Sequence, residues 1–280
     1  MMVNAGINKP LLRVVVYGLL TVLTIIFVYP LFITMANSLN PLYSLSTLLP
    51  TAFEWENYKM AVTTIEFPEY LKNSLIICAI SVPLTTLSSA LAGFAFARLR
   101  APGKKLLFVI ITSTMMLPGI VTQIPTYILF HKMNFIDTFY PWLLWGIGGA
   151  PFFIFMYRQF FSTVPKELEE AARIDGCSTF RMYATIFMPL ATPATWTTVI
   201  MLFQGTWGDF ITPFMFLRDE HYPLATALAT IGYHLPDNPN VILAQPSSAA
   251  AILFMIPTIA AFFFGQRYLV DGIAAGAVKG

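Results

Sequence analysis

Six long stretches of this chain contain no Asp, Glu, Lys or Arg, and each is long enough to cross a bilayer. Inside hydrocarbon every backbone polar group must be paired within the chain, so each stretch is best explained as a helix. The first stretch is too long for one helix. Its apolar part ends near Ala36, and Asn37, Ser38, Asn40 and Pro41 are expected to form a loop. The charge-free runs are 14–53, 73–97, 106–130, 138–157, 182–208 and 238–266.

Composition excludes an ordinary soluble protein. Hydrophobic residues make up 57% of the chain and charged residues only 11%, whereas soluble domains average about 25% charged residues. The net charge of +2 gives no basis for nucleic-acid binding, and the surrounding partner is expected to be membrane lipid. Cys78 and Cys177 lie far apart in the sequence and form neither a disulfide framework nor a metal motif.

The distribution of basic residues predicts the orientation. When the N-terminus is placed inside, most of the 16 Lys and Arg residues fall in cytoplasmic segments. The sequence therefore predicts an all-α membrane protein with both termini in the cytoplasm. Its six transmembrane helices are expected at about 12–36, 72–97, 106–130, 139–158, 189–217 and 245–266.

The segment 158–188, between the fourth and fifth predicted spans, is a long cytoplasmic loop. Pro165 suits the first helical position, and Gly176 suits the left-handed position after the helix end. Ser178 is expected to cap a second helix that continues towards Pro189. A mostly small, apolar strip is formed at helical spacing by Leu168, Ala171, Ala172 and Asp175. Such a strip suits docking of a soluble partner, although a helix resting on the bilayer surface is the alternative.

This loop resembles the EAA loop of ABC importer permeases, through Glu170-Ala171-Ala172, Gly176, Ile186 and Pro189. The wider run Glu170–Gly176 resembles the carbohydrate-uptake, MalG-like (MalFG) family. The resemblance implies that the whole chain, 1–280, is one type I ABC importer transmembrane domain. It also implies that the loop is a coupling helix held by an ATPase subunit, with Glu170 contacting a basic residue there.

The C-terminal segment 267–280 resembles the tail of MalG-type permeases, which reaches into the ATPase dimer interface. The residues that carry this expectation are Gln266, Arg267, Gly276 and Lys279. A disordered terminus is the alternative explanation.

The fifth predicted span contains Gln204, Trp207 and Asp209, which are candidates for a path for the substrate. Trp207 can stack on a sugar ring, while Gln204 and Asp209 can bond hydroxyl groups. Gly208 stands where related sugar permeases carry Asn, which weakens the resemblance there. Packing against a partner permease is the competing explanation, because the resemblance places the substrate pocket of maltose-type systems mainly in the other permease.

No phosphate-binding loop, serine nucleophile motif or metal motif occurs in the sequence, so the chain is not expected to be an enzyme or to bind a cofactor. ATP and magnesium are expected on the partner instead. The resemblance implies a permease subunit of a binding-protein-dependent ABC importer for a carbohydrate, an oligosaccharide or a glycerol-phosphate-like compound, in the bacterial inner membrane. Its partners would be a second, different permease, two ATPase subunits and an external solute-binding protein. An ion-coupled secondary transporter and a membrane-embedded enzyme or structural subunit are the alternatives.

Overall fold

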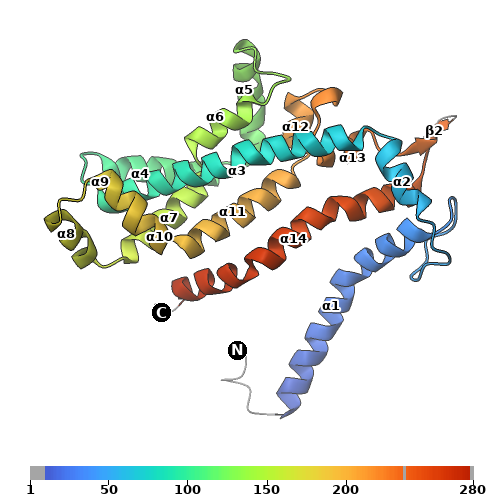
Figure 1. Cartoon of the computed structure of the whole chain (residues 1–280), viewed down its shortest axis with the longest axis horizontal. Helices are drawn as coiled ribbons and strands as arrows, with labels where there is room; N and C mark the ends of the chain where they lie inside the picture. The colour runs from blue at the N-terminus through green and yellow to red at the C-terminus, as the bar shows by residue number, and fades with distance from the viewer. Residues whose placement is uncertain (1–9, 236–237, 278–280) are drawn as a thin grey trace. The chain divides into compact units, whose positions relative to one another are not determined.

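The computed structural model describes residues 10–235 and 238–277, and almost all of its regular structure is helical (Figure 1). The chain divides into two compact parts. One part comprises Met1–Phe67 and Ile231–Met255, and the other comprises Pro68–Thr230 and Ile256–Gly280.

Three of the charge-free runs form single long helices, as predicted. They are α1 (Pro10–Leu39), α3 (Phe67–Arg98) and α14 (Ala244–Ala277). Each contains a segment that is long and apolar enough to cross a membrane. Helix α1 extends beyond the predicted end at Ala36 and includes Asn37 and Ser38. The Ser38 hydroxyl is satisfied there by the carbonyl of Met35 (2.7 Å) and by Tyr58 Oη (2.9 Å), so the polar residues do not end the helix.

The other three runs are interrupted, and for them the prediction of one helix per run is wrong. Helix α4 (Lys104–Ser113) and the 3₁₀ turn η2 (Thr114–Met116) are followed by α5 (Gly119–Lys132) after a bend of 104°. The bend lies at Pro118, which has no N–H to donate and keeps the preceding residue out of helical geometry. Leu117 is accordingly extended, with φ −79° and ψ 123°.

The fourth run divides into α6 (Tyr140–Gly148) and α7 (Pro151–Thr163). Gly149 between them has φ +69°, a left-handed conformation that favours glycine. The fifth run, 182–208, contains α10 (Met188–Leu190) and α11 (Thr192–Trp207), and α12 (Ile211–Phe216) follows it within the predicted span 189–217. The segment Thr179–Leu190 is bent by 78° against α11.

By length and apolarity, the described part of the chain offers three spanning helices, or up to five if each bent pair is one span. The six-span topology with cytoplasmic termini therefore remains a prediction. The all-α prediction is correct apart from a short antiparallel hairpin of β1 (His234–Leu235) and β2 (Asn238–Ile242). The remaining short helices are α2 (Glu56–Thr63), α8 (Lys166–Ile174), α9 (Thr179–Met182), the π turn η3 (Tyr183–Phe187), the 3₁₀ turn η4 (Asp219–His221) and α13 (Leu224–Thr230).

Buried amide side chains hold together the part of the fold that contains α1 and α2. The Asn57 amide donates to the carbonyls of Ser38 (3.1 Å) and Asn40 (2.8 Å). The Asn40 side-chain oxygen in turn accepts from the backbone N–H of Thr51 (2.8 Å). The two bonds from Asn57 satisfy the carbonyl of Ser38 in the last turn of α1, which lacks a partner within the helix, and that of Asn40 just after it.

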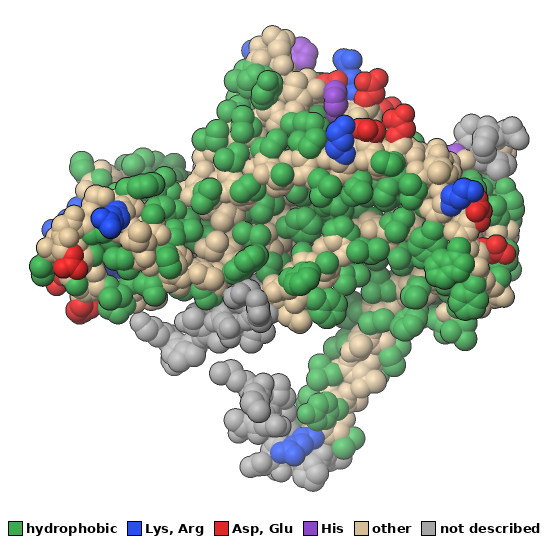
Figure 2. Space-filling model, in the orientation of Figure 1, with side chains coloured by type: hydrophobic (Ala, Val, Ile, Leu, Met, Phe, Trp, Pro, Cys, Tyr) green, Lys and Arg blue, Asp and Glu red, His purple; other side chains and the backbone are tan. Residues whose placement is uncertain are grey.

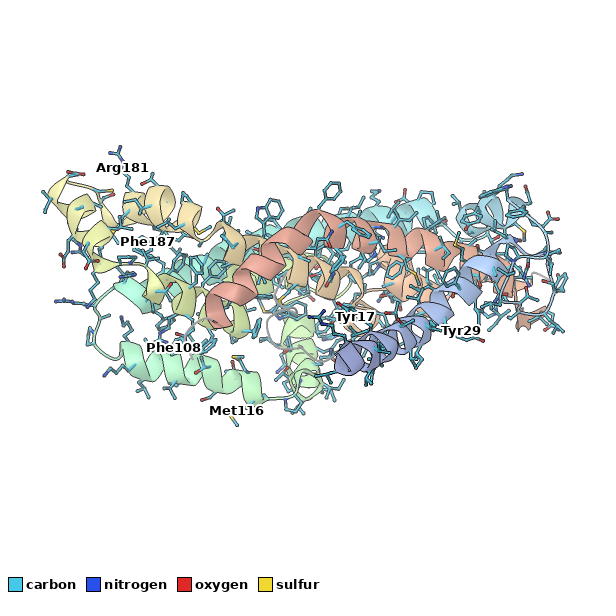
Figure 3. All side chains as sticks on the ribbon, turned by 90° about the horizontal axis from the view of Figure 1, so that it is seen from below. Tyr17, Tyr29, Phe108, Met116, Arg181 and Phe187 are labelled. Atoms are coloured by element: carbon cyan, nitrogen blue, oxygen red, sulfur yellow. The ribbon has the colours of Figure 1, made fainter. Side chains whose placement is uncertain are left out.

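Aromatic packing forms the core of the other part. Phe94 of α3 lies 5.0 Å from Phe187 and 5.9 Å from Phe161, measured between ring centroids. All three rings are buried, whereas Arg181, two residues before η3, extends away from the helices (Figure 3). By contrast, hydrophobic side chains cover much of the outer face drawn in Figure 2, which suits a chain solvated by lipid rather than water.

The small residues Ser89, Gly93 and Ala97 recur every four positions on α3 and allow α7 to approach closely. A Cβ atom at Gly93 would lie 2.5 Å from Tyr157 Cβ and 3.0 Å from the backbone nitrogen of Arg158. The Ser89 hydroxyl accepts the N–H of Ala150 at 3.0 Å, at the start of α7. Small residues at regular spacing are a common basis for helix contact in membranes.

We expect Gly93→Ala to destabilise the protein, because the added methyl must push α7 away. Overpacking of this kind costs about 1–3 kcal/mol, which exceeds the gain of about 1 kcal/mol in helix propensity. Gly18→Ala in α1 is the matched control, since a Cβ there meets nothing within 4 Å. Thermal unfolding of the purified protein should show a lower midpoint for Gly93→Ala only. Equal midpoints for the two variants would contradict the packing argument.

A hydrogen-bonded corner joins the loop before α6 to η4. Asp137 Oδ1 lies 2.8 Å from His221 Nδ1 and accepts the backbone N–H of Arg218 at 3.0 Å. Burial by itself raises the pKa of Asp137. The hydrogen bonds from His221 and Arg218, together with their positive charges, lower the pKa by more than burial raises it, so the pKa lies below its ordinary value. The corner is thus stabilised by the ionised carboxylate.

The stability contributed by Asp137 should be lost in acid. Because its pKa is lower in the folded protein, the contribution is present above the unfolded pKa of about 3.9 and disappears as the pH falls through the folded value. Asp137→Asn should therefore lower the unfolding midpoint at pH 7, and the gap from wild type should shrink below about pH 4. A gap that is constant from pH 7 to pH 3 would refute this assignment.

Candidate functional site

The segment that follows α7 forms an ordered helix–turn–helix unit. Helix α8 begins at Lys166, one residue later than predicted, because Pro165 occupies the N-cap position with an extended ψ of 142°. Glu167 and Glu169 lie in the first turn, where the positive end of the helix dipole favours acidic side chains.

Gly176 ends α8 in the left-handed conformation that the sequence predicts, with φ +73°. Its N–H donates to the carbonyl of Arg173 (3.1 Å), and the N–H of Cys177 donates to the carbonyl of Ala172 (2.9 Å). This pair of bonds is a Schellman motif, which caps the free carbonyls of the helix end. Hydrogen bonds therefore fix the direction in which the chain leaves α8.

The second helix starts as predicted. Ser178 Oγ accepts the N–H of Arg181 at 3.3 Å and caps α9. The helix then passes through the π turn η3 before it reaches Pro189 in α10. A π turn is an irregularity that is frequent at functional sites, and here it carries the buried ring of Phe187.

One buried arginine ties this unit to the rest of the bundle. The Arg98 side chain, 7% exposed at the end of α3, lies 3.6 Å from the Glu169 carboxylate of α8. Its guanidinium also donates to the carbonyls of Phe161 (3.0 Å from Nε) and Val164 at the end of α7, and it lies 5.0 Å from the centroid of the Phe187 ring. Arg98 thus joins α3, α7, α8 and η3, a role that sequence analysis missed.

The predicted coupling residues divide between two faces of α8. Ala172 is buried in the aromatic core, so it packs α8 onto the bundle. The other predicted residues are exposed, namely Leu168, Glu170, Ala171, Asp175 and Gly176.

The same surface carries two large apolar side chains that the sequence analysis did not single out. Ile174 is 86% exposed and Phe180 is 71% exposed, on either side of the Gly176 turn. The available signal was their apolar character within an otherwise charged segment. In Figure 2, Lys, Arg, Asp and Glu side chains lie around the place that α8 and α9 occupy in Figure 1, at the left of both views.

The predicted tail interface begins within the last turns of α14. Helix α14 continues through Arg267 and Gly276 to Ala277, so the backbone there is helical. Gln266 is exposed and donates to the carbonyl of Phe263 within α14. Lys279 lies outside the described residues.

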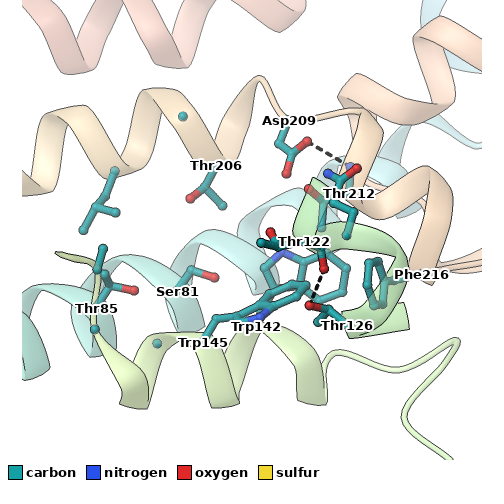
Figure 4. Close-up of a pocket in the computed structure, with 16 residues that line it drawn as sticks. Ser81, Thr85, Thr122, Thr126, Trp142, Trp145, Thr206, Asp209, Thr212 and Phe216 are labelled. Carbon is teal, nitrogen blue, oxygen red and sulfur yellow. Dashed lines mark hydrogen bonds between the residues drawn. The ribbon is translucent and has the colours of Figure 1, made fainter. Parts of the chain in front are cut away.

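A cavity of about 390 Å³ lies between α3, α5, α6, α11 and α12 (Figure 4). This volume falls within the range of small-molecule sites, roughly 300–1,000 Å³. Hydroxyl and aromatic side chains dominate its wall. The hydroxyl groups belong to Ser81, Thr85, Thr122, Thr126, Thr206 and Thr212, and the aromatic rings to Trp142, Trp145 and Phe216.

Of the three predicted path residues, only Asp209 lines this cavity. One carboxylate oxygen of Asp209 accepts the backbone N–H of Thr212 at 3.1 Å. Trp207 is buried and stacks on Phe203, with centroids 5.5 Å apart, while Gln204 is exposed elsewhere on α11. The structure therefore does not bring Gln204 and Trp207 to the cavity that Asp209 lines.

Comparison with known proteins identifies the family. Residues 86–274 match the family model of the binding-protein-dependent transport system inner membrane component. The match covers more than half of the chain, including α7 to α11. The chain belongs to this family.

Relatives of this permease match it over nearly their whole length. It is 29% identical to the maltodextrin transport system permease protein MdxG of Bacillus subtilis, over 99% of this chain and 100% of that protein. It is 30% identical to the trehalose/maltose transport system permease protein MalG of Thermococcus litoralis, over 91% of each chain.

The fold agrees with this assignment. A chain of a bacterial ABC transporter that imports the acidic polysaccharide alginate superimposes with a TM-score of 0.82, over 92% of the permease and 96% of that chain, at 19% identity. The permease therefore has the fold of an ABC importer subunit. Within its described residues, no group of three or more His, Cys, Asp or Glu is arranged to hold a metal ion.

We expect Arg98→Met to loosen α8, because it removes the bonds to two carbonyls and one of the two arginines that pair with the largely buried Glu169 carboxylate. Arg173 remains, 2.8 Å from that carboxylate. Each buried hydrogen-bonding group left without a partner costs about 1–3 kcal/mol. Amide hydrogen exchange over residues 164–176 should become faster. Arg100→Met, an exposed arginine two residues away, is the matched control and should leave the exchange unchanged. Equal exchange in both variants would rule out the anchoring role.

Proposed function

We propose that this permease is one of two membrane-spanning subunits of a binding-protein-dependent importer that moves a carbohydrate, an oligosaccharide, across the bacterial cytoplasmic membrane. ATP hydrolysis takes place on separate ATPase subunits. The observation that carries the proposal is the α8 unit, which is anchored inside by Arg98 and Ala172 and presents an exposed surface outside.

The exposed surface of α8 suits an ATPase contact. Leu168, Ile174 and Phe180 offer apolar side chains that a partner can bury, and Glu170 offers a charge that sets the orientation. Because α8 is fixed to α3 and α7 through Arg98, a displacement of α8 by the ATPase is transmitted to the bundle. In this way closure of the ATPase pair would switch the cavity between inward- and outward-facing states, and ATP with magnesium stays on the partner.

The complete complex, as proposed, contains this permease, a second and different permease, two ATPase subunits and an external solute-binding protein. The permease crosses the membrane six times with both termini in the cytoplasm, and its C-terminal tail reaches the ATPase pair. The outer segments with Glu54 and Glu69, and with Arg218 and His221, are candidates for contact with the binding protein.

The carbohydrate assignment rests on the relatives, whose names specify maltodextrin, trehalose or maltose, and melibiose, raffinose or stachyose. Membership of the family leaves the secondary-transporter hypothesis without support. A membrane enzyme is likewise not favoured by any feature of the described residues.

Substitution of the exposed α8 surface tests the proposal. The permease is expressed with its genomic neighbours and purified through a tag on this chain. Glu170→Ala combined with Gly176→Pro should lose the ATPase or uncouple ATP hydrolysis from transport, because proline cannot adopt the φ of +73° at position 176.

Glu167→Ala is the control, since Glu167 is an exposed acid in the same helix outside the predicted set. It should co-purify with the ATPase and remain coupled. If no ATPase associates with the wild type and the isolated chain moves solute in liposomes, the importer proposal is wrong.

A further inference from the structure

The cavity between α3, α5, α6, α11 and α12 contains polar atoms whose bonding capacity is unused. Ser81 Oγ and Gln123 Oε1 are both buried and have no hydrogen-bond partner within the described part of the chain. Both residues line the cavity, and Ser81 is only 8% exposed. Buried polar atoms are almost always paired, so two such atoms at one cavity indicate a site that a polar ligand completes.

The other polar groups of the wall suit hydroxyl-bearing ligands. A threonine or serine hydroxyl can both donate and accept a hydrogen bond, as a sugar hydroxyl can. Figure 4 shows Ser81 and Thr85 on one helix facing Thr206 on another across the cavity. Sets of such groups on opposite walls can bond a ring that carries hydroxyls on several of its carbons.

The aromatic side of the cavity adds a flat apolar surface. Trp145 is 36% exposed and is held in place by Trp142 and Phe216, whose centroids lie 5.8 Å and 5.4 Å from its own. A large rigid ring beside polar groups is typical of small-molecule sites, and it can pack against the C–H face of a pyranose.

The charge of the cavity restricts the ligand further. Asp209 is the one charged group among the described residues that line it, and no Lys, Arg or His is among them. A carboxylate in a confined space repels an anion and accepts hydrogen bonds from hydroxyl groups. The wall is therefore suited to an uncharged polyol and unsuited to a phosphorylated or uronic acid sugar.

We propose that this subunit itself contacts the transported solute in this cavity and selects neutral sugars over anionic ones, through Gln123, Ser81, Trp145 and Asp209. The inference rests on the proposed importer function and adds to it the substrate class and the residues of the contact. Gln123, Ser81 and Trp145 take the place of Gln204 and Trp207 as the candidate solute contacts of this chain, beside Asp209.

The test uses the complete complex in proteoliposomes, with its binding protein and ATP. The probes are radiolabelled maltotriose and raffinose as neutral sugars and digalacturonate as an anionic one. Wild type should take up at least one neutral sugar and not digalacturonate. Gln123→Leu and Ser81→Ala should each reduce uptake of that sugar about tenfold, the effect of losing roughly 1.4 kcal/mol of binding. Asp209→Asn should reduce the discrimination against digalacturonate.

Two controls separate a ligand contact from a structural effect. Gln204→Leu replaces an exposed glutamine outside the cavity and should leave uptake unchanged. The thermal midpoint of Ser81→Ala should not fall, because its hydroxyl has no partner to lose. A lowered midpoint with unchanged uptake would assign Ser81 to packing and overturn its role.

The outcomes distinguish the inference from the function on which it rests. Coupled uptake that is unaffected by Gln123→Leu and Ser81→Ala would overturn the inference and leave the importer proposal intact. Uptake of digalacturonate at the rate of the neutral sugars, or in place of them, would also overturn it. Failure of the wild type to bind an ATPase, or to take up any of the three probes, would overturn the proposed function and the inference together.

Discussion

The position of α8 depends on one buried positive charge at the end of α3. A guanidinium removed from water needs compensation, and Arg98 obtains it from two backbone carbonyls, the Glu169 carboxylate and an aromatic face. Those partners come from different helices, so satisfying one charge fixes several elements at once. The exposed face of α8 thereby remains accessible to a partner, while its buried face stays packed against the other helices.

Interruptions in the apolar runs are the second constraint. Pro118 and Gly149 break two of them, and the polar groups released at each break need partners inside the fold. Ser89 supplies one by accepting the N–H of Ala150 at the start of α7. The break at Pro118 also contributes a wall of the cavity, because α5, which is bent by 104° from the preceding helix, lines it through Thr122, Gln123 and Thr126.

The proposed binding role of the cavity opposes its stability. An unpaired buried polar atom costs about 1–3 kcal/mol, and the wall contains two of them. Replacing Ser81 and Gln123 by apolar residues would relieve that cost, whereas a hydroxyl-rich ligand relieves it only when it is bound. In the proposed transport site, Ser81 Oγ and Gln123 Oε1 would be available when the solute arrives, because neither is committed to another group of the described chain.

Local sequence determined the membrane character, the long helices α1, α3 and α14, and the turn geometry at Gly176 and Ser178, because charge-free length and capping chemistry are properties of neighbouring residues. It also located the exposed Glu170 of α8. Tertiary structure decided that Arg98 reaches Glu169, and that Asp209 shares a cavity with Ser81 and Gln123 while Trp207 does not. Those contacts join residues far apart in the chain, and periodicity within one helix carries no information about which distant side chains face it.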